Sequence, residues 1–417
     1  MAAASPVVLP DARNLTPAEF EARFEAASVP CVLQGLATSW PAARGAWAVA
    51  RLCERFPAHE WDMGLESGVT TTLPAFLREH RAGVEAAAKG GPAAPPAGLP
   101  APARYIFDDT FGEALPELLR DFDIPPIFPP SERDPLTYLS VVPALRPRYR
   151  WLLVGVPGSG FTIHQDPFGT SAWNTLLEGG RKRWALLPPT TPLGLVLPSL
   201  GGGGGGGGSG DDVGSDAPPR NPNQPQEPPP YWAAPDSADG DSDAGVELPE
   251  HEASAAAWFA HVLPRLRERA RAEFGLRDDA ELGLLEVEQR PGDTLFIPAG
   301  WWHVALTLPP GEEEEEERGG GHEPPTGGER GLTVAVTYNY MPSCGFAAAL
   351  LRLAARPGGA RAAYRWCRRA ADAGLAEAAR CLDLPEVAAG RVQHELELAA
   401  EGDAGDGAAP VAMATAA

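Results

Sequence analysis

The chain has few cysteines, and they are not arranged to cross-link a small fold or to bind zinc. Its five cysteines, among 417 residues, show no C-x-x-C spacing and no regular pairing. Secreted disulfide-rich domains and zinc-finger modules both need such spacing, so the sequence excludes both classes. We expect free thiols in a reducing compartment, either nuclear or cytoplasmic.

Long apolar runs and a targeting leader are also missing. No stretch approaches the roughly 18 consecutive apolar residues that a membrane-spanning helix needs. The first residues, Met1-Ala-Ala-Ala-Ser-Pro6, lack the basic start and apolar stretch of a signal peptide. We therefore expect no membrane partner.

Glycine and proline, by contrast, are abundant, and they gather in segments that are poor in core residues. Residues 198–252 contain eight consecutive glycines followed by repeated Pro, Asp and Ser, and residues 309–331 contain six consecutive glutamates. Such segments bury too little apolar surface to offset the entropy of ordering them. We predict disordered insertions there and at 86–103, and a flexible tail at 386–417.

The net charge of −22 arises mainly in the two longest insertions. Residues 198–252 hold eleven acids and one arginine, and residues 309–331 hold eight acids and two arginines. Acidic flexible loops favour solubility and argue against nucleic-acid binding through bulk charge. The glutamate run could instead attract a basic peptide, and the sequence leaves that alternative open.

A His-x-Asp pair and a distant histidine are the strongest chemical signal in the chain. His164 and Asp166 are two residues apart, so on a strand both side chains would point to one face. The bare pair also occurs as a surface or capping pair, and it needs structural context. With His303 as a third ligand, the set would leave three metal positions open, which suits non-haem Fe(II).

The residues around these ligands resemble a known family. Asp166 is followed by Pro167-Phe-Gly-Thr-Ser-Ala-Trp173-Asn174 and then Arg181-Lys-Arg-Trp184, and His303 ends the run Gln289-Arg-Pro-Gly-Asp-Thr-Leu-Phe-Ile-Pro-Ala-Gly-Trp-Trp-His303. Here the chain resembles the Jumonji C (JmjC) family of Fe(II)- and 2-oxoglutarate-dependent oxygenases. It is most similar to the subgroup of the bifunctional arginine demethylase and lysyl hydroxylase, over residues from about 15 to 344 and the helices that follow.

The resemblance implies a mainly β fold, a double-stranded β-helix (cupin-like jelly roll) flanked by N-terminal and C-terminal helices. Short runs bounded by Gly or Pro independently predict strands at 151–155, 160–164, 183–187, 284–288, 294–297, 303–308 and 332–338. Thr16-Pro-Ala-Glu19 predicts a capping box with proline at the first helical position. Further helices are predicted at 46–56, 73–81, 346–355, 360–373 and 375–382.

The expected organisation has four parts. Residues 1–104 would support the barrel, and residues 105–345 would form the catalytic domain, interrupted by the two insertions. Residues 346–385 would form C-terminal helices, which in relatives pack on the barrel or build a dimer contact, and residues 386–417 the tail. A homodimer through these helices is therefore a prediction.

The resemblance also implies a site for 2-oxoglutarate, whose distal carboxylate needs a buried cation. Lys182 matches the family lysine, while Asn174, Thr337 and Tyr105 match polar residues around the cosubstrate. Relatives have one residue fewer before this lysine, so Arg181 is an alternative, and Lys182 could also be a surface charge. Thr162 would share a face with His164, although it is displaced by one position from the hydroxyl that some relatives use.

Three further residues are candidates for the surroundings of the metal. Asn339 lies two residues after Thr337 and would share its face. Trp301 and Trp173 are near the ligands in sequence, although tryptophans in barrels more often pack than contact a substrate. One ring could shield the iron from bulk water.

The implied function is an Fe(II)-dependent enzyme that uses 2-oxoglutarate and O2, with ascorbate in support. It would hydroxylate a side chain of a protein or peptide by hydrogen abstraction and rebound, with lysine favoured. Demethylation of methyl-arginine or methyl-lysine is the alternative, and no residue distinguishes the two. Two other classes stay open: a non-catalytic cupin-like binding protein, and an enzyme that uses the same barrel with another metal.

Deletion of Gly201 to Gly245 should leave the melting temperature nearly unchanged, because a disordered insertion contributes no packing and its loss only shortens a loop. Thermal unfolding of the deleted and full-length chains measures this. A large drop in melting temperature would show that the segment packs against the fold.

Overall fold

The computed structural model describes residues 7–63, 68–88, 105–128, 148–196, 254–309, 331–355 and 359–392. The predicted insertion at 198–252 lies outside these residues, as do most of 309–331, most of 86–103 and the tail after residue 392. The predictions of disorder for these segments stay predictions. All five cysteines lie in the described part and are free, as their spacing indicated.

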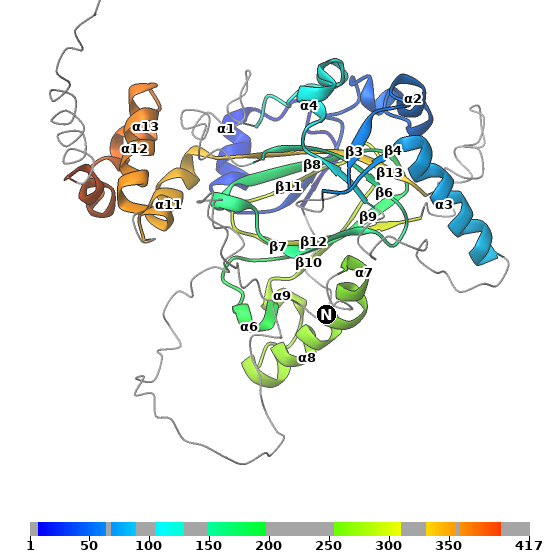
Figure 1. Ribbon diagram of the computed structural model, residues 1–417. Helices are drawn as coiled ribbons and strands as arrows, with labels where there is room; N and C mark the ends of the chain where they lie inside the picture. Colours follow the sequence, from blue (N-terminus) through cyan, green and yellow to red (C-terminus); the bar gives the residue numbers. More distant parts are fainter. Residues whose placement is uncertain are drawn as a thin grey trace, which may run out of the picture.

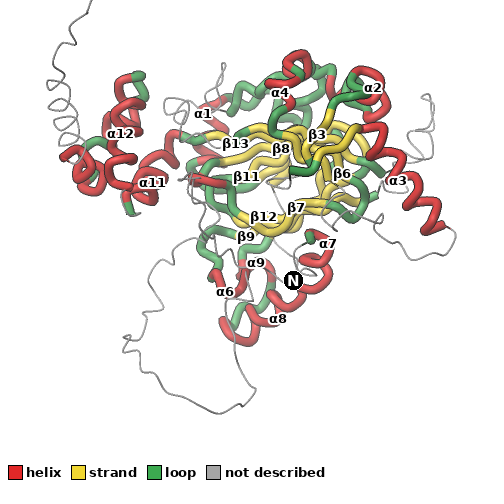
Figure 2. The backbone as a smooth tube through the Cα atoms, viewed as in Figure 1, coloured by secondary structure: helices red, strands yellow, loops and turns green. Residues whose placement is uncertain are grey.

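Two facing β-sheets form the centre of the fold, which confirms the jelly-roll prediction (Figures 1 and 2). The larger sheet has the order β1 (Val7–Leu9), β2 (Cys31–Leu33), β11 (Thr294–Ile297), β8 (Ser171–Gly179), β13 (Thr333–Tyr340), β6 (Arg150–Gly155) and β5 (Tyr105–Asp108). The smaller sheet has the order β10 (Leu285–Gln289), β9 (Arg181–Leu187), β12 (Trp302–Leu308) and β7 (Gly160–His164). Each strand predicted from a Gly- or Pro-bounded run is present.

Side chains alternate between the space inside the two sheets and their outer faces. On β9, Trp184 and Leu186 join the inner cluster, whereas Ala185 and Leu187 join an outer cluster with helical residues. The inner side chains of β5, β6, β8 and β13 form a second cluster made of Tyr105, Trp151, Leu153, Leu176 and Ala335. Any residue two positions from these along a strand therefore faces the barrel interior.

The N-terminal residues cover the outer face of the larger sheet and also extend that sheet. The capping box is present, since the Thr16 backbone N–H donates to the Glu19 carboxylate at 3.0 Å and the Glu19 N–H donates to Thr16 Oγ1 at 3.3 Å. Phe20 packs edge-on against Phe296 of β11, with ring centroids 4.8 Å apart. Because β1 pairs with β2 and β2 pairs with β11, the N-terminal region contributes two strands to the barrel sheet as well as covering it.

The helices of the N-terminal half are short apart from one. They are α1 (Pro17–Phe20), α2 (Val49–Arg55), α3 (Leu73–Ala88) and α4 (Phe111–Ala114), with a π-helical turn at Glu21–Glu25 and 3₁₀ turns at Ala42–Arg44, Pro116–Arg120 and Pro167–Gly169. A two-stranded sheet of β3 (Glu60–Asp62) and β4 (Thr70–Thr72) lies among them. None of the helices in the described residues is long and apolar enough to cross a membrane.

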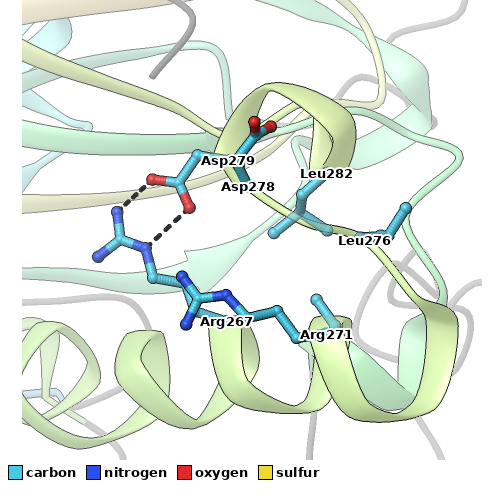
Figure 3. Close-up of a pocket in the computed structure, with 7 residues that line it drawn as sticks. Arg267, Arg271, Leu276, Asp278, Asp279 and Leu282 are labelled. Atoms are coloured by element: carbon cyan, nitrogen blue, oxygen red, sulfur yellow. Dashed lines mark hydrogen bonds and ion pairs between the residues drawn. The ribbon is translucent and has the colours of Figure 1, made fainter. Parts of the chain in front are cut away.

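Helices also cover the outer face of the smaller sheet (Figure 1). They are α6 (Leu193–Val196), α7 (Ala255–Ala257), a π-helical turn (Trp258–Val262), α8 (Leu263–Phe274) and α9 (Asp279–Leu282). Arg267 of α8 binds Asp279 of α9 at 2.6 Å and Glu286 of β10 at 2.6 Å. Figure 3 shows the Arg267–Asp279 pair beside a shallow hollow lined by Arg271, Leu276 and Leu282. This ion pair network joins the helices to the edge of the sheet.

The C-terminal helices pack mainly on one another at one side of the barrel (Figure 1). They are α11 (Ser343–Ala354), α12 (Gly359–Asp372) and α13 (Ala376–Cys381), close to the predicted ranges. Phe346 of α11 packs edge-on against Trp366 of α12, with ring centroids 5.0 Å apart. A buried apolar core therefore holds the three helices together.

The turn from β8 to β9 fixes the direction of the β9 side chains. Gly179 has φ +100°, and a Cβ at this position would clash with the Leu332 carbonyl oxygen and the Thr333 Cα. Only glycine fits both the backbone conformation and this close approach. After the turn, Lys182 is buried, while the neighbouring Arg181 pairs with Glu288 at 2.8 Å on the outer side.

Gly179→Ala should destabilise the fold by roughly 3 kcal/mol or more, since it combines a positive φ with a backbone clash. Gly158→Ala is the matched control, because Gly158 also has a positive φ (+84°) but has nothing within 4 Å of its Cβ position. The control should cost only about 1 kcal/mol. Urea unfolding measures both, and equal costs would show that the close approach to Leu332 is unimportant.

Candidate functional site

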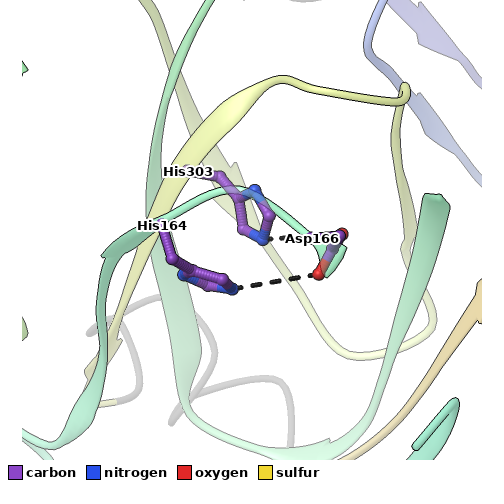
Figure 4. A group of neighbouring side chains, drawn as sticks. All are labelled: His164, Asp166 and His303. Carbon is purple, nitrogen blue, oxygen red and sulfur yellow. Dashed lines mark ion pairs between the residues drawn. The ribbon is translucent and has the colours of Figure 1, made fainter. Parts of the chain in front are cut away.

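Three side chains that could bind a metal converge at one end of the barrel (Figure 4). His164 ends β7, Asp166 follows it by two residues, and His303 lies on β12, which pairs with β7 so that His303 stands opposite His164. Their ligand atoms all lie within 4.8 Å of one another. The Nε2 atoms of His164 and His303 are each 3.9 Å from an Asp166 oxygen.

Backbone carbonyls hold both imidazoles in one orientation. His164 Nδ1 lies 2.8 Å from the Thr162 carbonyl oxygen, and His303 Nδ1 lies 3.0 Å from the Trp301 carbonyl oxygen. A carbonyl only accepts, so each Nδ1 carries the proton and each Nε2 presents its lone pair to the centre. The rings are thus ready to act as neutral nitrogen donors.

The pKa values of the histidines support this state. Burial, with the charge of His303 as a second cause, lowers the pKa of His164 to about 3, and burial lowers the pKa of His303 to about 4. Both rings are therefore neutral at physiological pH, as metal ligands must be. The side chain of His164 is 20% exposed and that of His303 5%, so the centre is open to solvent on the His164 side.

Asp166 has a polar neighbour of its own. Burial raises the pKa of Asp166 above its usual value, whereas His164 and a hydrogen bond from Asn339 oppose that rise. The Asn339 amide also donates to Thr170 Oγ1 at 3.4 Å. Asn339 thus lies beside Asp166, and its amide is in position to orient the carboxylate.

Lys182 is a buried basic side chain, and no carboxylate of the described residues pairs with it. It is 1% exposed, its Nζ donates to the Tyr105 hydroxyl at 3.2 Å, and it lies 5.9 Å from the ring centre of Trp184. Burial lowers the pKa of Lys182 to about 7. A buried charge is costly unless it is paired, so this site favours an anionic ligand. Arg181, the alternative, points to the outer face.

Within the described residues, three buried polar atoms on β6, β7 and β8 have no hydrogen-bond partner and belong to candidate site residues or their neighbours. They are Thr162 Oγ1, Asn174 Oδ1 and the indole Nε1 of Trp151. Thr337, which pairs in register with both Asn174 and Trp151, donates its hydroxyl to the Trp173 carbonyl at 2.9 Å. Such unpaired groups are rare in native interiors, and several together indicate a site for a polar ligand.

The two tryptophan candidates have different positions. Trp301 packs in the inner cluster, and its carbonyl contacts His303. Trp173 faces the opposite way: it stacks on Tyr338 at 4.9 Å and on Phe128 at 5.6 Å in the outer cluster with the N-terminal helices. The expectation for Trp173 is therefore corrected, because its neighbour Asn174 takes the inner face of β8.

The sequence reasoning missed a row of aromatic rings next to His164. Phe161 packs edge-on against His164 with ring centroids 4.6 Å apart, and Phe107 stacks on Phe161 at 5.0 Å. Trp151 lies 5.5 Å from Phe107. The alternation Tyr105-x-Phe107 on β5 was a signal for this row, but only the sheet order brings β5 and β7 to the same side of the barrel.

Gly155 is a second missed residue. A Cβ there would come within 2.7 Å of Thr307 Oγ1 and 2.8 Å of the Tyr105 ring. Thr307 stands opposite Lys182 in the pairing of β12 with β9. The missing side chain at Gly155 thus lets Tyr105 approach the lysine from the opposite sheet.

Comparisons with known proteins agree with this geometry. A family model described as a cupin-like domain matches residues 17–346. The chain is 30% identical over 299 residues to the lysine-specific demethylase JMJ21 of Arabidopsis thaliana, covering 72% of this chain and 24% of that protein. It is 28% identical over 298 residues to the bifunctional arginine demethylase and lysyl-hydroxylase psr-1 of Caenorhabditis elegans, covering 71% and 57%.

A third relative is the arginine-specific demethylase JMJ22 of Arabidopsis thaliana, 26% identical over 296 residues that cover 71% of this chain and 43% of that protein. The matched part thus spans between a quarter and three fifths of these relatives. The family match itself covers most of the chain and contains the strands β2 to β13. The chain therefore belongs to the cupin-like domain family, and it is of the Jumonji C type.

Proposed function

We propose that this chain is an Fe(II)- and 2-oxoglutarate-dependent oxygenase that hydroxylates a lysine side chain of a protein or peptide. The observation that carries the proposal is the combination of a two-histidine, one-carboxylate cluster with a buried lysine that has no acidic partner within the described part of the chain. Demethylation of a methylated arginine or lysine is the second candidate. It is favoured by the names of three relatives, each of which describes a demethylase.

His164, Asp166 and His303 would hold the iron. The donor set fits Fe(II), since two neutral imidazole nitrogens and a carboxylate oxygen lie on one side and leave the other positions open. Fe(II) bound there supplies activation of O2 coupled to the oxidative decarboxylation of 2-oxoglutarate. The chain keeps the two rings fixed through the Thr162 and Trp301 carbonyls.

Lys182 and Tyr105 would bind the distal carboxylate of 2-oxoglutarate. A charge-assisted bond from Lys182, together with the Tyr105 hydroxyl, would neutralise that carboxylate within a region closed to solvent. The unpaired atoms of Asn174, Thr162 and Trp151 are suited to further polar contacts, and Thr337 lies beside them. Binding of the anion would restore the pKa of Lys182 toward its ordinary value.

The substrate would enter along the aromatic row beside His164. Phe107 and Phe161 are half-buried and lie on the side where the centre is open. Aromatic faces attract cations, so this row favours a lysine or arginine side chain over an acidic one. Hydroxylation and demethylation differ only in the carbon presented, because a hydroxylated N-methyl carbon breaks down to formaldehyde and an amine.

We also propose a reductant, an oligomeric state and a cellular compartment for the enzyme. Ascorbate would keep the iron ferrous, the C-terminal helices would form a homodimer contact, and the enzyme would act in the nucleus or cytoplasm. The two other functional classes are a non-catalytic binding protein and an enzyme with another metal. The first is disfavoured by the three suitable metal donors, and the second by the buried lysine.

His164→Ala and Asp166→Ala should abolish 2-oxoglutarate turnover while leaving the fold nearly intact, because neither side chain belongs to an apolar core cluster. Succinate release with Fe(II) and ascorbate measures turnover, and thermal unfolding without metal measures the fold. Retained turnover in both variants would remove the cluster from the mechanism. A wild-type chain with no turnover, even without protein substrate, would favour the binding-protein alternative.

Lys182→Met should raise the KM for 2-oxoglutarate roughly 10- to 100-fold, the usual loss for a charge-assisted bond to a carboxylate. Arg181→Met is the matched control, since Arg181 lies next to it on β9 but points outward. The control should leave KM unchanged. If both variants behave alike, or if turnover never depended on 2-oxoglutarate, an enzyme with another metal would be the better account.

The lowered pKa of Lys182 also predicts a pH dependence of folding in the absence of ligand. Between about pH 7 and pH 10 the unfolded lysine holds a proton that the folded lysine has lost. Stability therefore rises with pH across this range. Urea unfolding at pH 7 and pH 9 should show that the stability of the wild type relative to Lys182→Met increases, and an unchanged difference would contradict the shift.

A further inference from the structure

We propose that Ser28 is a positioning residue for His303, acting through the indole of Trp301. This inference rests on the proposed role of His303 as a metal ligand. Ser28 lies in the N-terminal residues, far from the ligands in sequence. Three observations carry the proposal: the backbone conformation of Ser28, the hydrogen bond that Ser28 accepts from Trp301, and the hydrogen bond that the Trp301 carbonyl accepts from His303.

Ser28 has an unfavourable backbone conformation. Its φ of 53° makes it the one non-glycine residue with a positive φ in the described part of the chain. The turn that contains it is closed by the Ser28 N–H donating to the Glu25 carbonyl at 3.0 Å and the Val29 N–H donating to the Phe24 carbonyl at 2.8 Å. A non-glycine residue stays in such a conformation where interactions of its side chain offset the strain.

The task of the Ser28 side chain is to accept a hydrogen bond from Trp301. The Trp301 indole N–H donates to Ser28 Oγ at 2.9 Å, and Trp301 is only 8% exposed. The indole N–H only donates, and a buried indole is more stable when an acceptor such as this hydroxyl is present. The hydroxyl therefore fixes the ring of Trp301 against the N-terminal residues.

The backbone of Trp301 connects its fixed indole ring to the metal ligand His303. The Trp301 N–H donates to the Pro298 carbonyl at 3.2 Å, which closes the turn before β12, and the Trp301 carbonyl accepts from His303 Nδ1 at 3.0 Å. A shift of the tryptophan moves the carbonyl that selects the tautomer and direction of His303. Residues of this type commonly change metal affinity when they are replaced.

The segment around Ser28 is itself anchored to the barrel. Glu25 is 6% exposed, and its carboxylate accepts a hydrogen bond from the Tyr340 hydroxyl of β13 at 2.8 Å. The turn before β12 is held from its other side, where the Ala299 N–H donates to Ser171 Oγ at 3.1 Å and Gln165 Nε2 donates to the Gly300 carbonyl at 2.5 Å. Ser28 thus supplies the contact from the N-terminal residues to this turn.

The test is Co(II) titration of the metal-free full chain, followed by the visible ligand-field absorption of the bound ion. Ser28→Gly removes the hydroxyl and relieves the positive φ, so the variant should fold at least as stably as the wild type. We expect its Co(II) Kd to rise about tenfold. Trp301→Phe, which removes the indole N–H, should weaken binding to a similar extent, and the double variant should be no weaker than the weaker single variant.

Trp302→Phe is the matched control, since Trp302 packs in the outer cluster on the other face of β12 and should keep wild-type affinity. A Ser28→Gly chain that binds Co(II) as tightly as the wild type would overturn the inference, and so would additive losses in the double variant. A wild-type chain that binds no Co(II) would instead overturn the proposed metal site. The two failures are therefore distinguishable.

Discussion

The antiparallel pairing of β7 with β12 is the constraint on which the candidate site depends. It places His303 directly opposite His164, although 139 positions separate them in the chain. A slip of one residue in this register would turn every side chain of one strand to the other face and send one histidine outward. Asp166 needs no such pairing, since it follows His164 by two residues. The geometry of the site therefore depends on the register of one pair of strands.

The smaller sheet also determines which basic side chain of β9 faces the barrel interior. On β9 the charged side chains alternate: Arg181 and Arg183 point outward to Glu288 and Glu286, and Lys182 points inward. The two arginines gain surface ion pairs of modest value, whereas the lysine is separated from both water and acid. The free-energy cost of burying this charge lowers the pKa of Lys182 to about 7 when no ligand is bound. An anionic ligand held between the two sheets is the simplest way to offset this cost.

The N-terminal residues connect the outside of the barrel to its site. They cover the larger sheet with aromatic packing, add two strands to its edge, and reach the turn before β12 through Ser28. Packing and positioning are thus carried out by the same segment. The family match begins at residue 17, well before the first ligand, and so includes Ser28 and β2. The C-terminal helices, in contrast, pack mainly on themselves.

The sequence by itself predicted most strands of the barrel, although not β1, β5 or β8, together with the capping box at Thr16 and the three metal candidates. The strands and the cap depend on local patterns, namely runs bounded by Gly or Pro and a cap three residues from its partner. Among the ligands only His164 and Asp166 form a local pattern, whereas His303 was identified through the family resemblance of the run that it ends. It favoured Lys182 but left Arg181 open, because a turn with one additional residue can shift the phase of the strand after it. Only the conformation of Gly179 and the pairing of β9 settled which side chain is inside.

The tertiary structure alone decided everything that depends on contacts between distant residues. It turned Trp173 away from the site, brought Phe107 beside Phe161, and left the indole of Trp151 without a partner inside the barrel. It also joined Ser28 to Trp301, a contact between residues 273 positions apart. The physical reason is that local periodicity specifies which face of a strand a residue takes, whereas the neighbours on that face depend on the order and register of all the strands.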